Sequence, residues 1–235
     1  MKEHIIAYAV NNNCYKSAQH LAPKGIVVHS TGANNPFLRR YVDAPKEVGT
    51  NVYGNHWNNP KPDGRSVCVH AFIGYDIHSE VRIAQILPYN VAPWGCGKGA
   101  KGSYNNTHIQ FEICEDGLSN RAYFEKVFGE AAEYCAYLCY IFGLEISSVV
   151  SHSEAYKLGY ASNHGDCDHW LRRFGWTMDT FRDNVRTIYE NNYSDKTDYA
   201  SLVCKKCGFT DETRGYLESY TYSSDLWRKL WLAMN

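Results

Sequence analysis

The run Gly25-Ile-Val-Val-His-Ser30 predicts a buried central strand with a histidine near its end. Short apolar runs that are rich in β-branched residues and bounded by turn signals are typical of buried strands. Such a strand holds an imidazole rigidly, so His29 is a candidate for a binding or catalytic role. A lone strand histidine is more often a hydrogen-bonded core residue, and His29 therefore needs partners from elsewhere in the chain.

Four further runs share the strand pattern, and helical periodicity lies between them. The additional predicted strands are residues 66–74, 81–87, 108–114 and 147–151. A helix is predicted from near Asn120 to a stop at Gly143, because apolar residues recur at spacings of three and four. A second helix is expected to begin at a Thr177 N-cap. This alternation predicts an α/β fold with a mixed central sheet flanked by helices.

Two long segments are expected to be loops, and the C-terminal end is expected to form a separate piece. Residues 33–62 and 90–106 are rich in Asn and Gly, and loops of this kind often build a substrate groove over a sheet. The polar segment 191–198 predicts a linker after a catalytic domain of residues 1–190. Residues 199–235 then form a small helical module, which is marginal in size for an independent core.

The composition limits the classes of partner. The chain has 235 residues, 44% of them hydrophobic, and a formal net charge of −1. Nucleic acid is not an expected partner, since a phosphate backbone requires a basic surface. Membrane insertion is not expected either, because no apolar run has the length of a membrane span.

The N-terminus and the cysteines suggest a cellular compartment. The start of the sequence, MKEHIIAYAVNNNCYK, contains no apolar core of signal-peptide length. Nine cysteines are an odd number, and several, such as Cys135 and Cys139, fall in periodic apolar segments, which favours reduced thiols. We therefore expect the protein to be cytoplasmic in the cell that makes it.

Residues 151–170, SHSEAYKLGYASNHGDCDHW, concentrate groups that bind metal ions. They contain three histidines, three acidic residues and a cysteine. A catalytic zinc ion takes three such side chains and a water molecule. His152 follows a predicted strand, so it and His29 can converge at one edge of a sheet. Spacing alone does not choose the third ligand, for which the following loop offers His164, Asp166, Cys167, Asp168 and His169.

Several ordered motifs resemble a known family. Residues 25–32 (GIVVHSTG), 106–115 (NTHIQFEICE) and 149–170 resemble the zinc-dependent N-acetylmuramoyl-L-alanine amidases of the type 2 class. These include phage endolysins and bacterial autolysins, and they share a fold with peptidoglycan recognition proteins. The resemblance implies a bacteriolytic hydrolase that uses one Zn²⁺ to cut the amide between N-acetylmuramic acid and L-alanine in bacterial peptidoglycan.

The resemblance also implies roles for individual residues. The family's metal ligands correspond to His29, His152 and Asp166, its general base corresponds to Glu112, and its basic residue two positions before the third ligand corresponds to His164. Many relatives have lysine at this basic position. Others have a Trp-His-Xaa-Gly motif where this chain has Trp94-Gly-Cys-Gly97. Cys167 and Asp168 stay alternatives to Asp166, while Glu115 and Glu154 stay alternatives to Glu112.

The sequence gives weaker evidence for the roles of several other residues. Substrate contact is predicted for His70, Trp94 and Asn106, although His70 is equally expected as a hydrogen-bonded core residue. Cys204 and Cys207 form a lone Cys-x-x-Cys pair, which is half of a structural zinc site at most. Residues 199–235 are expected to bind the cell wall or to make a homo-oligomer, because Trp227, Trp231 and Tyr220 suggest an exposed aromatic group.

Three function classes follow from these observations. We expect the protein to be a lytic enzyme of a phage. The first class is the amidase, the second is a peptidoglycan-binding protein of the same fold without catalysis, and the third is a zinc peptidase that cuts within the stem peptide. An endolysin without an export signal would accumulate in the cytoplasm and act on the wall after release. A muropeptide-recycling amidase is the alternative.

Overall fold

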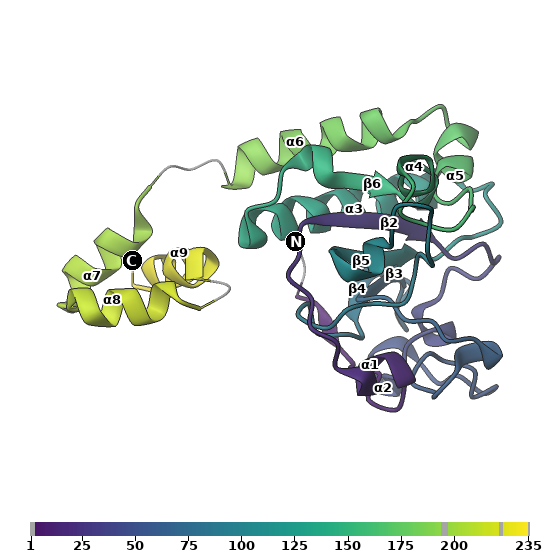
Figure 1. Cartoon of the computed structure of the whole chain (residues 1–235), viewed down its shortest axis with the longest axis horizontal. Coiled ribbons are helices and arrows are strands. Elements are labelled where there is room, and N and C mark those ends of the chain that lie inside the picture. Colours follow the sequence, from purple (N-terminus) through teal and green to yellow (C-terminus); the bar gives the residue numbers. More distant parts are fainter. Residues whose placement is uncertain (1–2, 194–196, 221–222, 235) are drawn as a thin grey trace.

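A six-stranded mixed sheet forms the centre of the chain. The computed structural model describes residues 3–193, 197–220 and 223–234. The strand order is β1-β4-β3-β5-β2-β6, with β3 and β4 antiparallel and the other neighbouring pairs parallel. The strands are β1 (Ile5–Ile6), β2 (Gly25–Ser30), β3 (Ala71–Tyr75), β4 (Val81–Gln85), β5 (His108–Ile113) and β6 (Val149–Ser151). This sheet, flanked by helices, confirms the predicted fold class (Figure 1).

Strand boundaries agree best where the sequence is most apolar. The predicted strand at Gly25 to Ser30 is β2, with all six residues buried. The prediction for 66–74 is wrong in its first half, since β3 begins only at Ala71. The prediction for 147–151 is wrong at its start, where a 3₁₀ turn, η4 (Ile146–Ser148), precedes β6. The short edge strand β1 was not predicted.

Two long helices cover one face of the sheet. They are α3 (Arg121–Phe142) and α6 (Met178–Tyr193), which pack on each other along the top of Figure 1. The Asn120 side chain accepts a hydrogen bond from the Tyr123 N–H, and Gly143 ends α3 in the left-handed conformation, as its φ of 61° shows. The core between these helices and the sheet includes Phe111, Phe124, Phe128, Trp170 and Phe181.

Shorter elements cover the opposite face. These are α1 (Asn13–Ser17), α2 (Pro45–Val48) and the 3₁₀ turns η1 (Leu38–Arg40) and η2 (Pro62–Gly64), at the bottom of Figure 1. Their core is smaller and contains a stack of Tyr41 on Phe72, with Trp57 edge-on to Phe72. The segment predicted as a loop over 33–62 is therefore largely folded onto the sheet.

Three short elements beside the sheet were not predicted from the sequence. Two short helices, α4 (His152–Leu158) and α5 (Asp168–Arg173), follow β6 and lie beside the carboxyl end of β2. The 3₁₀ turn η3 (Tyr104–Asn106) leads into β5. In a sheet with parallel neighbours, the carboxyl ends of adjacent strands are where ligand sites form.

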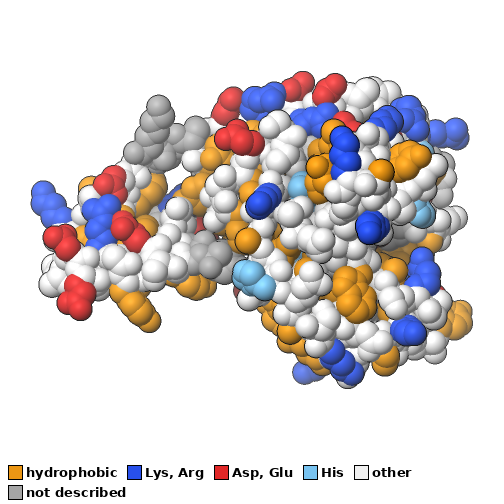
Figure 2. Space-filling view, viewed as in Figure 1, with side chains coloured by type: hydrophobic (Ala, Val, Ile, Leu, Met, Phe, Trp, Pro, Cys, Tyr) orange, Lys and Arg blue, Asp and Glu red, His pale blue; other side chains and the backbone are white. Residues whose placement is uncertain are grey.

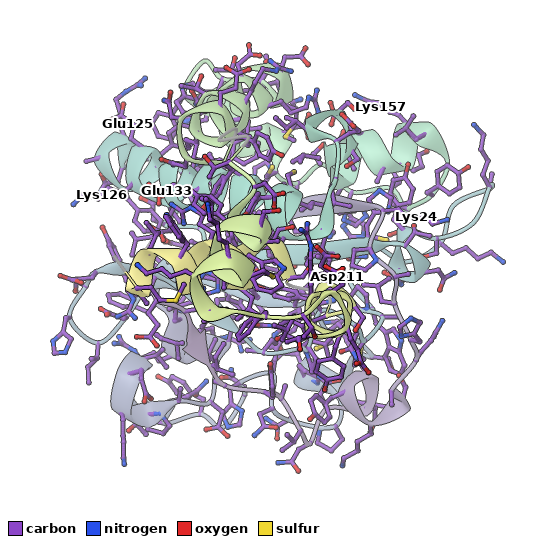
Figure 3. The ribbon with its side chains drawn as sticks, turned by 90° about the vertical axis from the view of Figure 1, so that its left-hand side faces the viewer. Lys24, Glu125, Lys126, Glu133, Lys157 and Asp211 are labelled. Atoms are coloured by element: carbon purple, nitrogen blue, oxygen red, sulfur yellow. The ribbon has the colours of Figure 1, made fainter. Side chains whose placement is uncertain are left out.

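The C-terminal module is a bundle of three short helices. It consists of α7 (Tyr199–Cys207), α8 (Asp211–Glu218) and α9 (Ser223–Ala233), which Figure 3 shows in front of the main domain. Trp227 is only 3% exposed and packs with Ala200 and Val203, so the expectation that Trp227 is exposed is wrong. The indole ring of Trp227 is part of the module's own core.

The boundary between the two parts differs from the prediction. Helix α6 continues to Tyr193, so the linker predicted from 191 begins inside a helix, and positions 194–196 of that predicted linker lie outside the described residues.

A cavity of about 1350 Å³ lies between the main domain and α9. Acidic and basic side chains lie side by side on the module surface (Figure 2). Among the described residues, no helix is long and apolar enough to cross a membrane.

Candidate metal centre and active site

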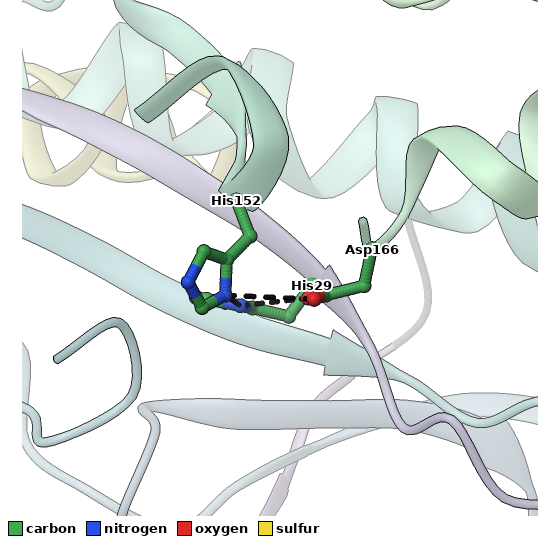
Figure 4. A group of neighbouring side chains, drawn as sticks. All are labelled: His29, His152 and Asp166. Atoms are coloured by element: carbon green, nitrogen blue, oxygen red, sulfur yellow. Dashed lines mark hydrogen bonds and ion pairs between the residues drawn. The ribbon is translucent and has the colours of Figure 1, made fainter. Parts of the chain in front are cut away.

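Two histidines and an aspartate converge at the carboxyl end of β2. The Nδ1 atom of His29 lies 3.1 Å from Nδ1 of His152 and 3.1 Å from Oδ2 of Asp166. The Nδ1 atom of His152 lies 3.5 Å from Oδ1 of Asp166. Figure 4 shows the three side chains, which come from β2, the start of α4 and the loop before α5.

In each imidazole, the hydrogen-bond partner of Nε2 determines whether Nδ1 presents a lone pair. His29 Nε2 lies 3.1 Å from the side-chain oxygen of Gln110, and His152 Nε2 lies 3.0 Å from the backbone oxygen of Ser162. Both partners are acceptors, so each Nε2 carries the proton and each Nδ1 presents a lone pair. Two lone pairs and a carboxylate oxygen that face one another in this way could hold a cation between them.

The donor set fits a zinc ion. Bonds of about 2.0–2.2 Å in a tetrahedron separate two ligand atoms by about 3.3 Å, which matches the distances within this group. Burial disfavours the charged form of Asp166, but His152 and His29, which donate hydrogen bonds to this carboxyl whenever their Nδ1 atoms carry a proton, outweigh burial and hold its pKa well below the usual range. Asp166 is therefore ionised at neutral pH, as a ligand must be.

The rival third ligands Cys167 and Asp168 are not part of the converging group. Cys167 is fully buried in the core beneath α3, and burial raises the pKa of its thiol. Asp168 is the first residue of α5. Within the part of the chain that the structure describes, the only group of three metal-binding side chains is His29, His152 and Asp166.

Glu112 lies beside this group on the neighbouring strand. It is directly opposite His29 in the parallel β2–β5 ladder, and it shares a face of β5 with Gln110, which contacts His29. Its Oε2 is buried and has no hydrogen-bond partner among the described residues. Burial raises the pKa of Glu112 well above its usual value, and the negative charges of Asp166 and Glu115 raise it further. An unpaired carboxylate with a raised pKa is suited to accepting a proton.

His164 lies on the solvent side of the group. Its ring is 4.9 Å from the ring of His152, between centroids, and its side chain is exposed. No hydrogen bond within the described residues ties its ring nitrogens to another group. His164 can therefore turn toward a bound substrate.

The other two glutamates that compete for the role of base are committed to ion pairs. Glu115 is 4% exposed, accepts a hydrogen bond of 2.6 Å from Ser30 Oγ and lies 3.0 Å from His169 Nε2. The hydrogen bond to Glu115 raises the pKa of His169. Glu154 accepts two hydrogen bonds from Arg182, at 2.8 and 3.0 Å. The Glu115–His169 pair ties the start of α5, and with it the Asp166 loop, to the ends of β2 and β5.

The residues predicted to contact substrate are placed differently from one another. His70 has no exposed surface, and its two nitrogens bond the Gln110 N–H and the Val91 oxygen, so the prediction of substrate contact is wrong for His70. It joins β5 to the segment before β3. Trp94 is half-buried and packs against the smaller core, the one that contains Tyr41 and Phe72. Asn106 is exposed and bonds Gln19, and Asn105 points inward in its place.

Three residues that support the centre were not predicted as site residues. They are Gln110, Asn105 and Ser162, which act on the ligands through amide and carbonyl groups. A polar residue at the apolar position 110 of a buried strand, two residues from Glu112, is the one signal in the sequence. Contacts made by a side-chain amide or a backbone carbonyl leave no pattern that spacing reveals.

Comparison with known proteins gives a family match over most of the chain. The sequence profile of the N-acetylmuramoyl-L-alanine amidase family matches residues 19–168, which include all three converging side chains and Glu112. The N-acetylmuramoyl-L-alanine amidase CwlA from Bacillus sp is 26% identical over 180 residues, which cover 73% of this chain and 68% of CwlA.

Solved structures show the same fold. The Staphylococcus aureus hydrolase AmiA, in complex with its ligand, is 22% identical, with a TM-score of 0.54 over 83% of this chain and 87% of AmiA. A mutant endolysin from Bacillus subtilis is 22% identical, with a TM-score of 0.54 over 79% of this chain and 99% of that protein. The catalytic domain of XlyA is 22% identical, with a TM-score of 0.56 over 78% of this chain and 99% of that domain.

Proposed function

The chain belongs to the N-acetylmuramoyl-L-alanine amidase family, and we propose that His29, His152 and Asp166 hold the zinc ion with which it hydrolyses peptidoglycan. The family activity cuts the amide between N-acetylmuramic acid and the L-alanine of the stem peptide. The observation that carries the metal assignment is the convergence of the Nδ1 atoms of His29 and His152 with the carboxylate of Asp166. Zinc in that position supplies a water nucleophile at neutral pH and polarises the scissile carbonyl.

Glu112 is the proposed general base. It lies opposite His29 in the sheet and has a buried oxygen without a hydrogen-bond partner among the described residues. Its raised pKa brings it closer to the working pH than an ordinary carboxylate, which favours proton transfer in both directions. Glu112 takes the proton that water loses as it attacks the carbonyl, and it can return that proton to the leaving amine.

His164 is the proposed donor to the oxyanion. Its exposed ring next to His152 can reach the oxygen that gains negative charge in the tetrahedral intermediate. A donor held at that point stabilises the transition state more than the substrate. The Asp166 loop carries His164 two residues before the proposed ligand, so the same loop sets both positions.

One experiment tests the activity and separates it from the other function classes. Purified protein is incubated with intact peptidoglycan, with and without a chelator, and the new end groups are identified. We expect free muramic lactyl carboxylates and free L-alanine amines, both lost on chelation and restored by zinc. New amines inside the stem peptide would instead indicate a peptidase, and bound wall without new ends would indicate a binding protein.

A lytic role and a wall-binding role for the C-terminal module are further parts of the proposal. Endolysins among the structural relatives support the lytic role. The module carries exposed apolar side chains, including Tyr216 at 77% and Leu232 at 55%, which support contact with the wall or with a second copy of the chain. Expression inside a susceptible cell together with a membrane-permeabilising agent tests lysis, and the alternative recycling role predicts none.

A further inference from the structure

We infer that Gln110 is a positioning residue which, held by Asn105, fixes the tautomer of His29 and so strengthens zinc binding. This inference rests on the proposed function, since it concerns the ligand that His29 offers. It assigns a role to the buried Gln110 and the half-buried Asn105, which take no part in the chemistry itself. The observation that carries it is an unbroken chain of hydrogen bonds from two backbone N–H groups to the His29 ring.

The chain of hydrogen bonds begins at the loop before η3. The side-chain oxygen of Asn105 accepts hydrogen bonds from the backbone N–H groups of Gly95, at 3.2 Å, and Cys96, at 3.0 Å. A backbone N–H can only donate, so the atom of Asn105 that faces both must be its oxygen. The orientation of this amide is therefore set by the backbone.

The orientation passes to Gln110. The Asn105 oxygen also accepts a hydrogen bond of 3.0 Å from Gln110 Nε2, and the same Nε2 lies 3.4 Å from Cys96 Sγ. With its nitrogen held there, Gln110 must turn its oxygen toward His29 Nε2, at 3.1 Å. An acceptor at this point keeps the proton on Nε2 and leaves Nδ1 free for the metal.

Gly95 makes space for this arrangement. A Cβ atom at Gly95 would lie 2.3 Å from the Gln110 oxygen and 2.9 Å from a methyl group of Val69. Neither group can withdraw easily, since Gln110 is completely buried. The absence of a side chain at Gly95 thus lets the Gln110 oxygen stand beside His29, and the polar chain depends on a steric gap as well as on hydrogen bonds.

Zinc affinity is the direct test, measured at pH 7.5 by competition with a chromogenic chelator. Gln110→Met keeps the length of the side chain and removes the acceptor, and Gly95→Ala displaces the acceptor without changing any polar group. We expect each to weaken zinc binding by about 10- to 100-fold, the usual effect of removing such a partner of a ligand. The matched control is Gln85→Met. Gln85 is another buried glutamine of the sheet, and it bonds the backbone oxygen of Leu87 instead.

A spectroscopic readout and a double variant separate positioning from general destabilisation. In zinc-loaded wild type, nuclear magnetic resonance should show a slowly exchanging His29 Nε2–H. Gln110→Met should lose it while keeping the Nε2–H of His152, which bonds Ser162. Asn105→Ala should weaken zinc binding in the wild-type background and add nothing in the Gln110→Met background, because Asn105 acts through Gln110.

The outcomes are distinguishable from failure of the proposed function. If wild type binds no zinc, the proposed function fails. If wild type binds zinc and both Gln110→Met and Gly95→Ala bind it equally well, only the role of Gln110 is refuted. Equal losses of affinity in Gln110→Met and Gln85→Met would also refute it, and so would additive effects in the double variant. If Gln110→Met does not fold, Gly95→Ala carries the same comparison.

Discussion

Glu112 is the residue on which the proposed chemistry depends most, and its replacement gives a clear expectation. Glu112→Gln keeps the shape of the side chain and removes its ability to accept a proton. We expect kcat to fall by roughly 10²- to 10⁴-fold, while the zinc content stays at that of wild type. The measurement is turnover on a muramoyl peptide, with metal content determined on the same sample.

Glu154→Gln is the matched control for this change. Glu154 is a neighbouring glutamate whose carboxylate bonds Arg182 and the Ser151 N–H. Its replacement should lower the free energy of unfolding and leave kcat of the folded enzyme almost unchanged. A metal-replete Glu112→Gln protein with full activity would refute the base assignment.

His164 should affect catalysis without affecting metal binding. Its ring is exposed and lies next to His152, outside the group of three converging atoms. We expect His164→Ala to lower kcat and retain zinc. His164→Lys should keep part of the activity and extend it to higher pH, because a lysine stays charged to higher pH than a histidine. Loss of zinc from His164→Ala would show that His164, rather than Asp166, is a ligand.

His70 should make the fold sensitive to acid. Burial lowers the pKa of His70 from 6.5 to about 4, so between these values the unfolded chain binds a proton that the native state does not. Stability contributed by neutral His70 is complete above about pH 6.5 and is lost as the pH falls toward 4. At pH 5 the loss amounts to about 2 kcal/mol.

Urea unfolding at pH 7.5 and pH 5.0 measures this effect. His70→Gln keeps a donor and an acceptor for Val91 and Gln110 but has no group that titrates, so its loss of stability on acidification should be smaller than that of wild type. His78→Gln, at an exposed position, should behave as wild type. Equal acid sensitivity in His70→Gln and wild type would contradict the assignment.

At the scale of elements, the N-cap of α4 links local sequence to the metal centre. The Ser151 hydroxyl accepts a hydrogen bond from the Glu154 N–H, and the Glu154 carboxylate accepts one from the Ser151 N–H. His152 is the first residue of the helix that this capping box begins. Ser151→Ala should lower the free energy of unfolding by about 1 kcal/mol and also weaken zinc binding, because His152 loses its fixed starting point.

Thr210→Ala provides the control for the cap. Thr210 caps α8 in the C-terminal module through the Thr213 N–H, far along the chain from the metal centre. It removes the same kind of hydrogen bond and should leave zinc affinity unchanged. If Ser151→Ala loses stability but binds zinc as tightly as wild type, the cap has a purely structural role.

Elements with strong periodicity could be predicted, and short elements could not. Helix α3 lies between Asn120 and Gly143 as expected, because 22 residues of apolar spacing and two caps agree. Helix α4 was missed, since its seven residues carry too few apolar positions to outweigh the preceding strand signal. Residues 66–70 were predicted as strand, but they lie outside any named strand and instead bond the Trp94 backbone and β5.

The same distinction holds for the candidate site. His29 could be predicted as a candidate because it ends an apolar run, and resemblance to the family singled out Asp166 in a loop with five possible ligands. The structure brings Asp166 rather than Cys167 to the two histidines, since Cys167 turns into the core. Gln110 and Asn105 could not be predicted, because their roles depend on which way an amide faces in three dimensions.

On the scale of the whole molecule, the C-terminal module is the part whose role is least tied to the catalytic domain. Its core of Ala200, Val203 and Trp227 is its own, and its described surface presents exposed side chains such as Tyr216 and Leu232. A truncated chain that ends at residue 193 should turn over a soluble muramoyl peptide at the wild-type rate. It should bind less to sedimented cell walls, or show a lower mass in solution if the module joins two copies of the chain.

A full-length variant guards against artefacts of truncation. Tyr216→Ala combined with Leu232→Ala removes exposed apolar surface and leaves the buried Trp227 in place, so the module stays folded. Loss of wall binding at unchanged mass supports a wall-binding module, and a fall in mass supports an oligomerisation module. If both the truncated chain and the double variant match wild type in wall binding and in mass, neither role is correct. The module would then contribute nothing to either property, and the main domain alone would select the substrate.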